Sequence, residues 1–141
     1  MDLDRALRIS AAGMAAQSTR LRVVAENLAN RDSTGESAGA DPYRRRTVSF
    51  ANRLDHALGS GSGPGTETVA VSRIGTAPGD FPTRFDPAHP AADARGYVKT
   101  PNVDSVVEVM DMREAQRGYS ANLSVLETTR GMLTRAIEAL R

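Results

Sequence analysis

The confinement of proline to the middle of the chain sets the strongest limit on what this sequence can fold into. All seven prolines lie between Pro42 and Pro101, and nine of the twelve glycines lie within residues 31–101. Proline breaks the interior of a helix and glycine weakens it, so long helices are expected only at the two ends. The sequence therefore predicts a helix, an irregular middle and a second helix.

The N-terminal end has an apolar residue every seven positions. This column contains Leu7, Met14, Leu21 and Leu28. A spacing of seven keeps one side of a helix toward a partner helix and produces a left-handed supercoil. We expect a helix over residues 3–29, ended by the turn-forming residues 30–35. Asn27 lies inside this helix, where asparagine has only mediocre propensity, so local preference does not explain it.

The C-terminal end has two such columns over residues 102–140, with Asn102 or Asp104 as the helix cap. The first column contains Met112, Tyr119, Leu126, Leu133 and Leu140. The second contains Val109, Gln116, Leu123, Arg130 and Ile137. Its two polar members cost stability but can fix the register and the choice of partner.

The middle of the chain alternates enough to predict short strands at 43–50, 68–74 and 95–100, with GSGSGPG at 59–65 as a flexible linker. The predicted fold class is mainly α with a small β part. Long N- and C-terminal helices form a coiled-coil-like pair, and the Gly/Pro-rich middle holds short antiparallel strands. We expect an N-terminal helix at 1–30, a middle at 31–101 and a C-terminal helix at 102–141, with the two ends together forming the core domain.

Composition excludes several classes of function. The chain has no cysteine, so disulfides, thiol catalysis and cysteine zinc sites are absent. A formal net charge of +1 gives no global field that would attract nucleic acid or an anionic membrane. The apolar runs are too short to span a bilayer, and AAGMAAQSTR near the N-terminus does not resemble a secretory signal.

No residue pattern indicates an active site or a metal site. His56 and His89 lack metal-type spacing, so we expect them to be solvated or bonded within turns. Arg44, Arg45 and Arg46 could contact nucleic acid, but a charged strand edge that blocks unwanted pairing is favoured. No cofactor and no small-molecule substrate are expected.

Periodicity alone leaves two interpretations of the terminal helices open. They can form an ordinary intramolecular hairpin, or they can be ends that are loosely ordered in the monomer and become ordered on meeting copies or partners. The second is the behaviour of an assembly subunit.

Four stretches of the chain resemble flagellar axial proteins, the rod and hook subunits. NLAN followed by a turn and Thr-Gly (27–35) resembles their N-terminal signature, although Asp32 and Ser33 stand where Asn and Thr are commoner. Residues 102–140 resemble their shared C-terminal helix, including Asn102-Val103-Asp104 and the pattern Arg117, Tyr119, Ala121-Asn122. PYRRRTVSF (42–50) and FDPAHPAADARGYVKTPNV (85–103) resemble the proximal-rod subunits. Only the 35–41 loop and the 59–65 region lie outside the resemblance.

The resemblance implies a non-enzymatic subunit of the bacterial flagellar basal body whose terminal helices pack against neighbouring subunits around a narrow channel. Asn27 and Asn30 would then offer amide hydrogen bonds at subunit contacts. The implied partners are its own copies in a helical assembly, other rod proteins, the adaptor between the rod and the membrane ring or export gate, and the flagellar type III export apparatus, which would export it without a cleaved signal peptide. The predicted interface residues are Leu7, Met14, Leu21, Val24, Asn27, Leu28, Asn30, Val109, Met112, Tyr119, Asn122, Leu123, Leu126, Leu133, Ile137 and Leu140.

Two other functions stay open at this point. A soluble coiled-coil adaptor that binds a helical partner would form a discrete oligomer in solution. A nucleic-acid binder that uses Arg44–Arg46 would show salt-sensitive binding to DNA or RNA.

Overall fold

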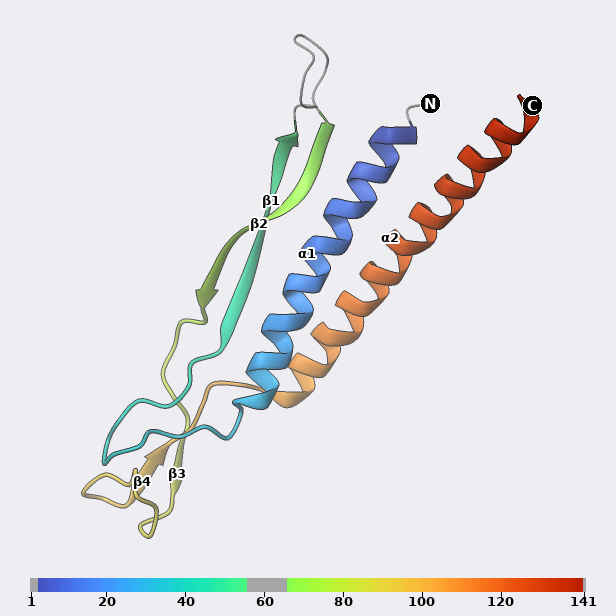
Figure 1. The fold of residues 1–141 in the computed structure, drawn as a ribbon. Helices are drawn as coiled ribbons and strands as arrows, with labels where there is room; N and C mark the ends of the chain where they lie inside the picture. The colour runs from blue at the N-terminus through green and yellow to red at the C-terminus, as the bar shows by residue number, and fades with distance from the viewer. Residues whose placement is uncertain (1–2, 56–65, 141) are drawn as a thin grey trace. The chain divides into compact units, whose positions relative to one another are not determined.

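A computed structural model describes residues 3–55 and 66–140 and confirms the predicted fold class, mainly α with a small β part. His56 and the predicted linker at 59–65 lie outside the described residues. The elements follow one another as α1 (Leu3–Ala29), β1 (Arg46–Asp55), β2 (Thr66–Thr76), β3 (Thr83–Phe85), β4 (Tyr97–Lys99) and α2 (Ser105–Ala139) (Figure 1). Neither α1 nor α2 is apolar enough over a sufficient length to cross a membrane.

Local hydrogen bonds fix the end of α1 and the start of α2. After Ala29, the Asn30 side chain donates to the carbonyl of Glu26 at 2.9 Å, and its backbone amide donates to the same carbonyl at 3.1 Å. Asp104 is the cap of α2, because its carboxylate accepts the backbone N–H of Val106 at 2.8 Å. Asn102, the other cap candidate, accepts the backbone N–H of Arg45 at 2.8 Å instead.

The strands agree only partly with their predicted limits. β2 contains the predicted 68–74 and β4 lies inside 95–100. The prediction that a strand begins at Tyr43 was wrong, since β1 begins at Arg46. The backbone N–H of Tyr43 donates to the Ser33 carbonyl, and the backbone N–H of Arg45 donates to the Asn102 side chain. Neither group bonds to a neighbouring strand. β3 was not predicted, because three residues are too few to show alternation.

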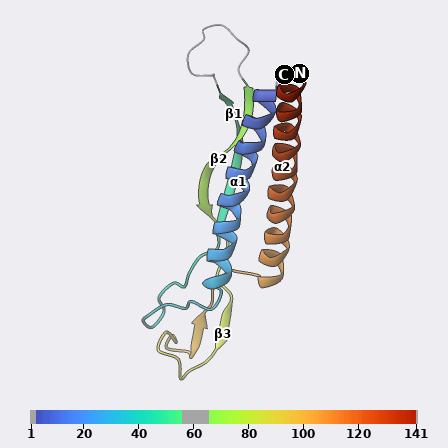
Figure 2. The ribbon, with the colours of Figure 1, turned by 45° about the vertical axis from the view of Figure 1, so that its right-hand side comes forward.

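The chain divides into two compact units, and each helix contributes to both. Unit 1 comprises Met1–Leu21, Ser49–Arg73 and Arg113–Arg141. Within it, α1 lies between the β1–β2 hairpin and α2 (Figures 1 and 2). Unit 2 comprises Arg22–Val48 and Ile74–Met112, and it contains the antiparallel β3–β4 sheet. Its buried apolar side chains are Val23, Val24, Ala91 and Val98.

In unit 1 the two helices approach each other through small and polar residues. Ala16 and Ala115 are the buried apolar side chains among its described residues. A Cβ atom at Gly13 would lie 2.8 Å from the Asn122 amide, and one at Gly118 would lie 3.0 Å from the Gln17 amide. Each glycine on one helix therefore makes room for an amide on the other.

This close approach predicts opposite effects for two glycine substitutions in unit 1. Gly13→Ala should lower the free energy of unfolding by about 1–3 kcal/mol, because the methyl group would displace the Asn122 amide. That amide also donates to the carbonyl of Gly118 at 2.8 Å. Gly131→Ala is the matched control, since nothing lies within 4 Å of its Cβ position, and it should raise stability by about 1 kcal/mol through helix propensity. Denaturant unfolding followed by circular dichroism measures both; equal effects would contradict the close approach.

Candidate subunit interface

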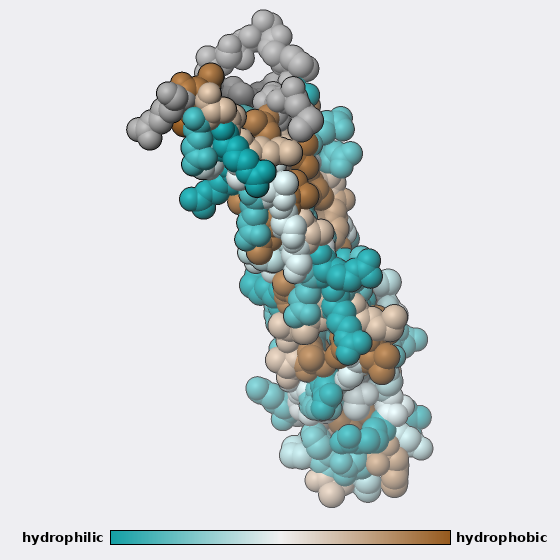
Figure 3. Space-filling view, turned by 90° about the vertical axis from the view of Figure 1, so that its right-hand side faces the viewer, coloured by the Kyte–Doolittle hydropathy of each residue, from teal (hydrophilic) through white to brown (hydrophobic). Residues whose placement is uncertain are grey.

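In unit 1 the predicted columns of residues spaced seven apart, called the leucine columns from here on, are half-buried or exposed. Leu7, Met14 and Leu21 of α1 are half-buried, as are Asn122, Leu126 and Leu133 of α2. Tyr119 and Leu123 are 37% and 38% exposed, Ile137 is 60% exposed and Leu140 is 89% exposed. Figure 3 shows hydrophobic residues at the surface on the side where α2 lies. The residues buried instead are Ser10, Gly13, Ala16, Ala115 and Thr129, which the heptad pattern did not identify.

In unit 2 the predicted interface residues divide differently. Val24 and Asn27 are buried, with 4% and 1% of their surface exposed. Leu28, Asn30 and Met112 are half-buried, whereas Val109 is 38% exposed. Whether any of these residues contacts a neighbouring subunit stays a prediction.

A groove of about 410 Å³ lies among the leucine columns of unit 1. It is lined by Leu7, Arg8 and Ala11 of α1 and by Leu126, Arg130 and Leu133 of α2, and its exposed lining is apolar. An apolar surface of this kind is suited to receive another protein.

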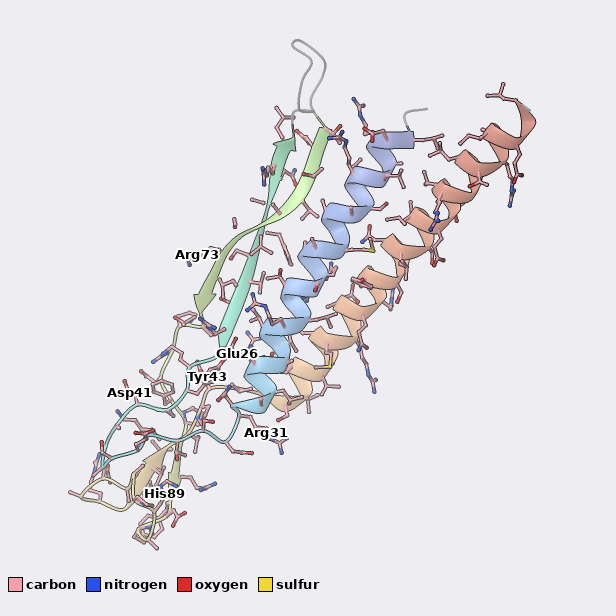
Figure 4. The ribbon with its side chains drawn as sticks, in the orientation of Figure 1. Glu26, Arg31, Asp41, Tyr43, Arg73 and His89 are labelled. Atoms are coloured by element: carbon pink, nitrogen blue, oxygen red, sulfur yellow. The ribbon has the colours of Figure 1, made fainter. Side chains whose placement is uncertain are left out.

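Asn27 makes four hydrogen bonds inside unit 2. Its Oδ1 accepts the Tyr43 hydroxyl at 2.8 Å and the Arg46 backbone N–H at 2.8 Å. Its Nδ2 donates to the Arg46 carbonyl at 2.9 Å and to Glu108 Oε2 at 3.1 Å. Figure 4 shows Tyr43 near the C-terminal end of α1, where Glu26 also lies. The structure thus gives the unexplained asparagine of α1 an intramolecular role.

The same cluster buries a carboxylate at the start of α2. Glu108 is fully buried, and its Oε1 accepts a hydrogen bond from Nε of Arg45. A second nitrogen of that guanidinium, Nη2, lies 3.2 Å from Asp111. Glu108 was missed by sequence reasoning, because an acidic residue in the first turn of a helix is ordinarily solvated at the positive end of the helix dipole.

The arginine run 44–46 and His89, the other candidates for a functional role, bind groups of their own chain. Arg44 lies 4.1 Å above the Phe81 ring and donates to the carbonyl of Gly79, and Arg46 pairs with Glu26. The predicted charged strand edge is therefore wrong for Arg44 and Arg45, which precede β1. His89 is bonded within a turn, as predicted, because its Nδ1 accepts the backbone N–H of Ala91 at 3.1 Å. Within residues 3–55 and 66–140 no group of side chains could hold a metal ion.

Three ionisable groups of unit 2 have shifted pKa values. Backbone N–H groups of Tyr97 and Arg95 bind the Asp93 carboxylate at 2.9 and 2.8 Å and lower its pKa. The hydrogen bond from Lys99 lowers the pKa of Asp41. Burial raises the pKa of the Tyr43 hydroxyl, which donates a hydrogen bond to Asn27.

Two family models match the ends of the chain. Residues 7–35 match "Flagella basal body rod protein", and residues 94–139 match "Flagellar basal body rod FlgEFG protein C-terminal". These matches define the class as basal-body rod proteins, as the sequence resemblance predicted.

Similar proteins narrow the class to one family. The chain is 48% identical to the flagellar basal-body rod protein FlgC of Agrobacterium fabrum, over 99% of this chain and 96% of the relative. It is 39% identical to FlgC of Bacillus subtilis, over 94% of each chain, and 40% identical to FlgC of Salmonella typhimurium, over 92% of this chain and 91% of that one. The chain belongs to the flagellar basal-body rod protein FlgC family. The predicted function as a structural rod subunit is thereby confirmed.

Substitutions of Arg45 and Arg46 should lower the free energy of unfolding by different amounts. Arg45→Met removes the partner of the buried Glu108 carboxylate and should cost about 3–5 kcal/mol of unfolding free energy. Arg46→Ala removes only a partly exposed pair with Glu26 and should cost less than about 1 kcal/mol, because its backbone bonds to Asn27 are kept. Urea unfolding of both variants gives the comparison. Equal losses of unfolding free energy would contradict the prediction that the buried Arg45–Glu108 pair contributes more than the Arg46–Glu26 pair.

Asp93 should make part of the stability of unit 2 depend on pH. Its pKa is lower in the folded chain than in the unfolded chain, so its contribution is fully present above about pH 4 and is lost as the pH falls through the folded value. Asp93→Asn cannot ionise, so the stability difference between the wild type and this variant should shrink on acidification below pH 4. Unfolding curves at a series of pH values test this, and a difference that does not change with pH would contradict it.

Proposed function

We propose that this chain polymerises through its terminal helices into the proximal rod of the flagellar basal body. The observation that carries the proposal is the position of the leucine columns in unit 1. The contact between α1 and α2 uses small and polar residues, which leaves Leu7, Leu126 and Leu133 partly exposed to a neighbour. Apolar surface of this kind gains free energy when a partner covers it.

The proposed interface consists of the predicted columns on both helices. Their exposed members, from Val109 to Leu140, would make direct contacts. Val24 and Asn27 would support the interface from beneath, because both are buried in unit 2. Residues 1–30 and 102–141 would form the core domain of the assembled subunit, with 31–101 as the middle.

Repetition of one heterologous contact by a rotation that does not close produces a helical tube. We infer that such a tube lines the export channel and transmits torque through many side-by-side helix contacts. Its neighbours would be its own copies, other rod proteins, and the adaptor to the membrane ring or export gate. The flagellar type III export apparatus would deliver the chain to the periplasm-spanning rod without a cleaved signal peptide, and the absence of cysteine suits this passage.

The contacts of the arginine run 44–46 argue against nucleic acid as a partner. Arg44, Arg45 and Arg46 all bind groups of their own chain. A coiled-coil adaptor is the competing function, and it would form a discrete oligomer in solution.

The decisive experiment examines basal bodies purified from the native organism and from a strain that lacks this chain. The proposal expects the chain in the purified basal bodies, with assembly arrested at the membrane ring in the deletion strain. Intact basal bodies in the deletion strain would overturn the proposal and favour the adaptor.

A single charge in the leucine columns should prevent assembly. Leu126→Asp and Leu21→Asp place a carboxylate where a partner would cover it, and burial of an unpaired charge is strongly unfavourable. Complementation of the deletion strain should then give no filaments and no motility. Leu126→Met, which conserves volume, is the control and should restore motility. Circular dichroism of each purified variant shows that it still folds. Normal filaments with either Asp variant would contradict the assignment of the columns.

A further inference from the structure

Residues 33–43 of unit 2 form a closed loop that the proposed helix contacts do not use. Its ends are joined because the backbone N–H of Tyr43 donates to the Ser33 carbonyl at 3.0 Å. Between them the chain turns back, with the backbone N–H of Ala40 donating to the Ser37 carbonyl at 3.0 Å. Compact loops with closed ends are frequently functional. The order of this loop depends on the contacts that it makes with the rest of unit 2.

His89 links loop 33–43 to the connection between β3 and β4. One ring nitrogen, Nδ1, accepts the backbone N–H of Ala91 at 3.1 Å. The other, Nε2, lies 3.4 Å from Oγ1 of Thr34 in the loop. The carbonyl of Ala91, a buried residue, accepts the backbone N–H of Gly39 at 3.3 Å. The loop is therefore held at two points of the connection, by His89 and by the residue whose N–H His89 binds.

The hydrogen bond from Ala91 requires a neutral imidazole. A ring nitrogen that accepts an N–H carries no proton, so the ring proton lies on Nε2, where it can be donated to Thr34. In the imidazolium ion both nitrogens carry protons and neither can accept. The Nδ1 proton would then oppose the N–H of Ala91. Rotation of the ring relieves this contact, and it also carries Nε2 away from Thr34.

We propose that His89 is a pH-sensitive latch, and that protonation of its ring releases residues 34–40 of the loop from the β3–β4 connection. Histidine ordinarily changes its charge between about pH 5 and pH 8, so the latch would open within this range. The contacts of the latch lie wholly within unit 2. The latch therefore does not depend on the proposed rod function, and it adds a response to acid that rod assembly does not require.

Other charged groups do not account for a change in this pH range. Carboxyl groups ordinarily titrate near about pH 4, and lysine and arginine above about pH 10. The Asp41–Lys99 ion pair, at 2.8 Å, holds the far end of the loop to β4, and lowered pKa values keep Asp41 and Asp93 ionised. In the described part of the chain, no ion pair joins the His89 ring to the charged side chains of the loop, the connection or the two strands, which are Glu36, Asp41, Arg84, Asp86, Asp93, Arg95 and Lys99.

Nuclear magnetic resonance of the full chain tests the latch between about pH 7.5 and pH 5. His56→Gln leaves His89 as the only histidine of the chain, so one ring titration is observed. The backbone amide signals of Ala91 and Gly39 should shift with the same midpoint as the ring of His89. Amide signals that stay constant while the ring titrates would overturn the proposal.

Cleavage after Glu36 by a glutamate-specific protease measures release of the loop, because cleavage requires local opening of the chain. In His89→Asn the side-chain carbonyl can accept the N–H of Ala91 but does not titrate. The chain with His89 should be cleaved at least about fivefold faster than His89→Asn near pH 5, and at an equal rate near pH 7.5. Comparison at each pH cancels the pH dependence of the protease. His89→Ala removes the acceptor and should be cleaved rapidly at both pH values.

Three results would overturn the latch. They are equal cleavage of the chain with His89 and of His89→Asn near pH 5, a rise in relative cleavage on acidification that persists in His89→Asn, and slow cleavage of His89→Ala at both pH values. Circular dichroism of each variant shows whether it still folds. The resonance experiment keeps His89 unchanged, so it decides the proposal even where a substitution of His89 prevents folding.

Discussion

The buried hydrogen-bond cluster around Asn27 is the constraint on which the arrangement of unit 2 depends. It joins the end of α1, the segment that leads into β1 and the first turn of α2 through one amide and one carboxylate. Burial of an amide and a carboxylate costs free energy unless their hydrogen bonds are satisfied. Here Tyr43, Arg45 and the backbone of Arg46 satisfy them together, so the segments must meet in one register.

In unit 1 the two helices approach each other closely without large interlocking side chains. In unit 1 the contact is made by Gly13, Gly118 and the amides that lie over them. Helices that pair through small residues keep their large side chains for other surfaces. This explains how a chain with few aromatic residues and little buried apolar surface can still offer broad apolar columns to a neighbour.

The sequence predicted the helices well because proline and glycine placement acts locally. The limits of α1 follow from propensity and turn chemistry, whereas the same chemistry left Asn102 and Asp104 as alternative caps of α2, between which the structure decides. The burial of Glu108 could not be predicted, since it depends on a guanidinium 63 residues away in the chain. The heptad pattern identified the apolar columns but not the line of close contact, because glycine and alanine carry no periodic signal of their own. β3 escaped prediction because its pairing with β4, and not its composition, makes it a strand.

The hydrogen bond between Asn27 and Glu108 joins the last turns of α1 to the first turn of α2 across 81 residues of chain. A chain that lacks α2 would leave the Asn27 amide and the Arg45 guanidinium without this carboxylate. The fold of unit 2 is therefore completed only when the last long segment of the chain is in place.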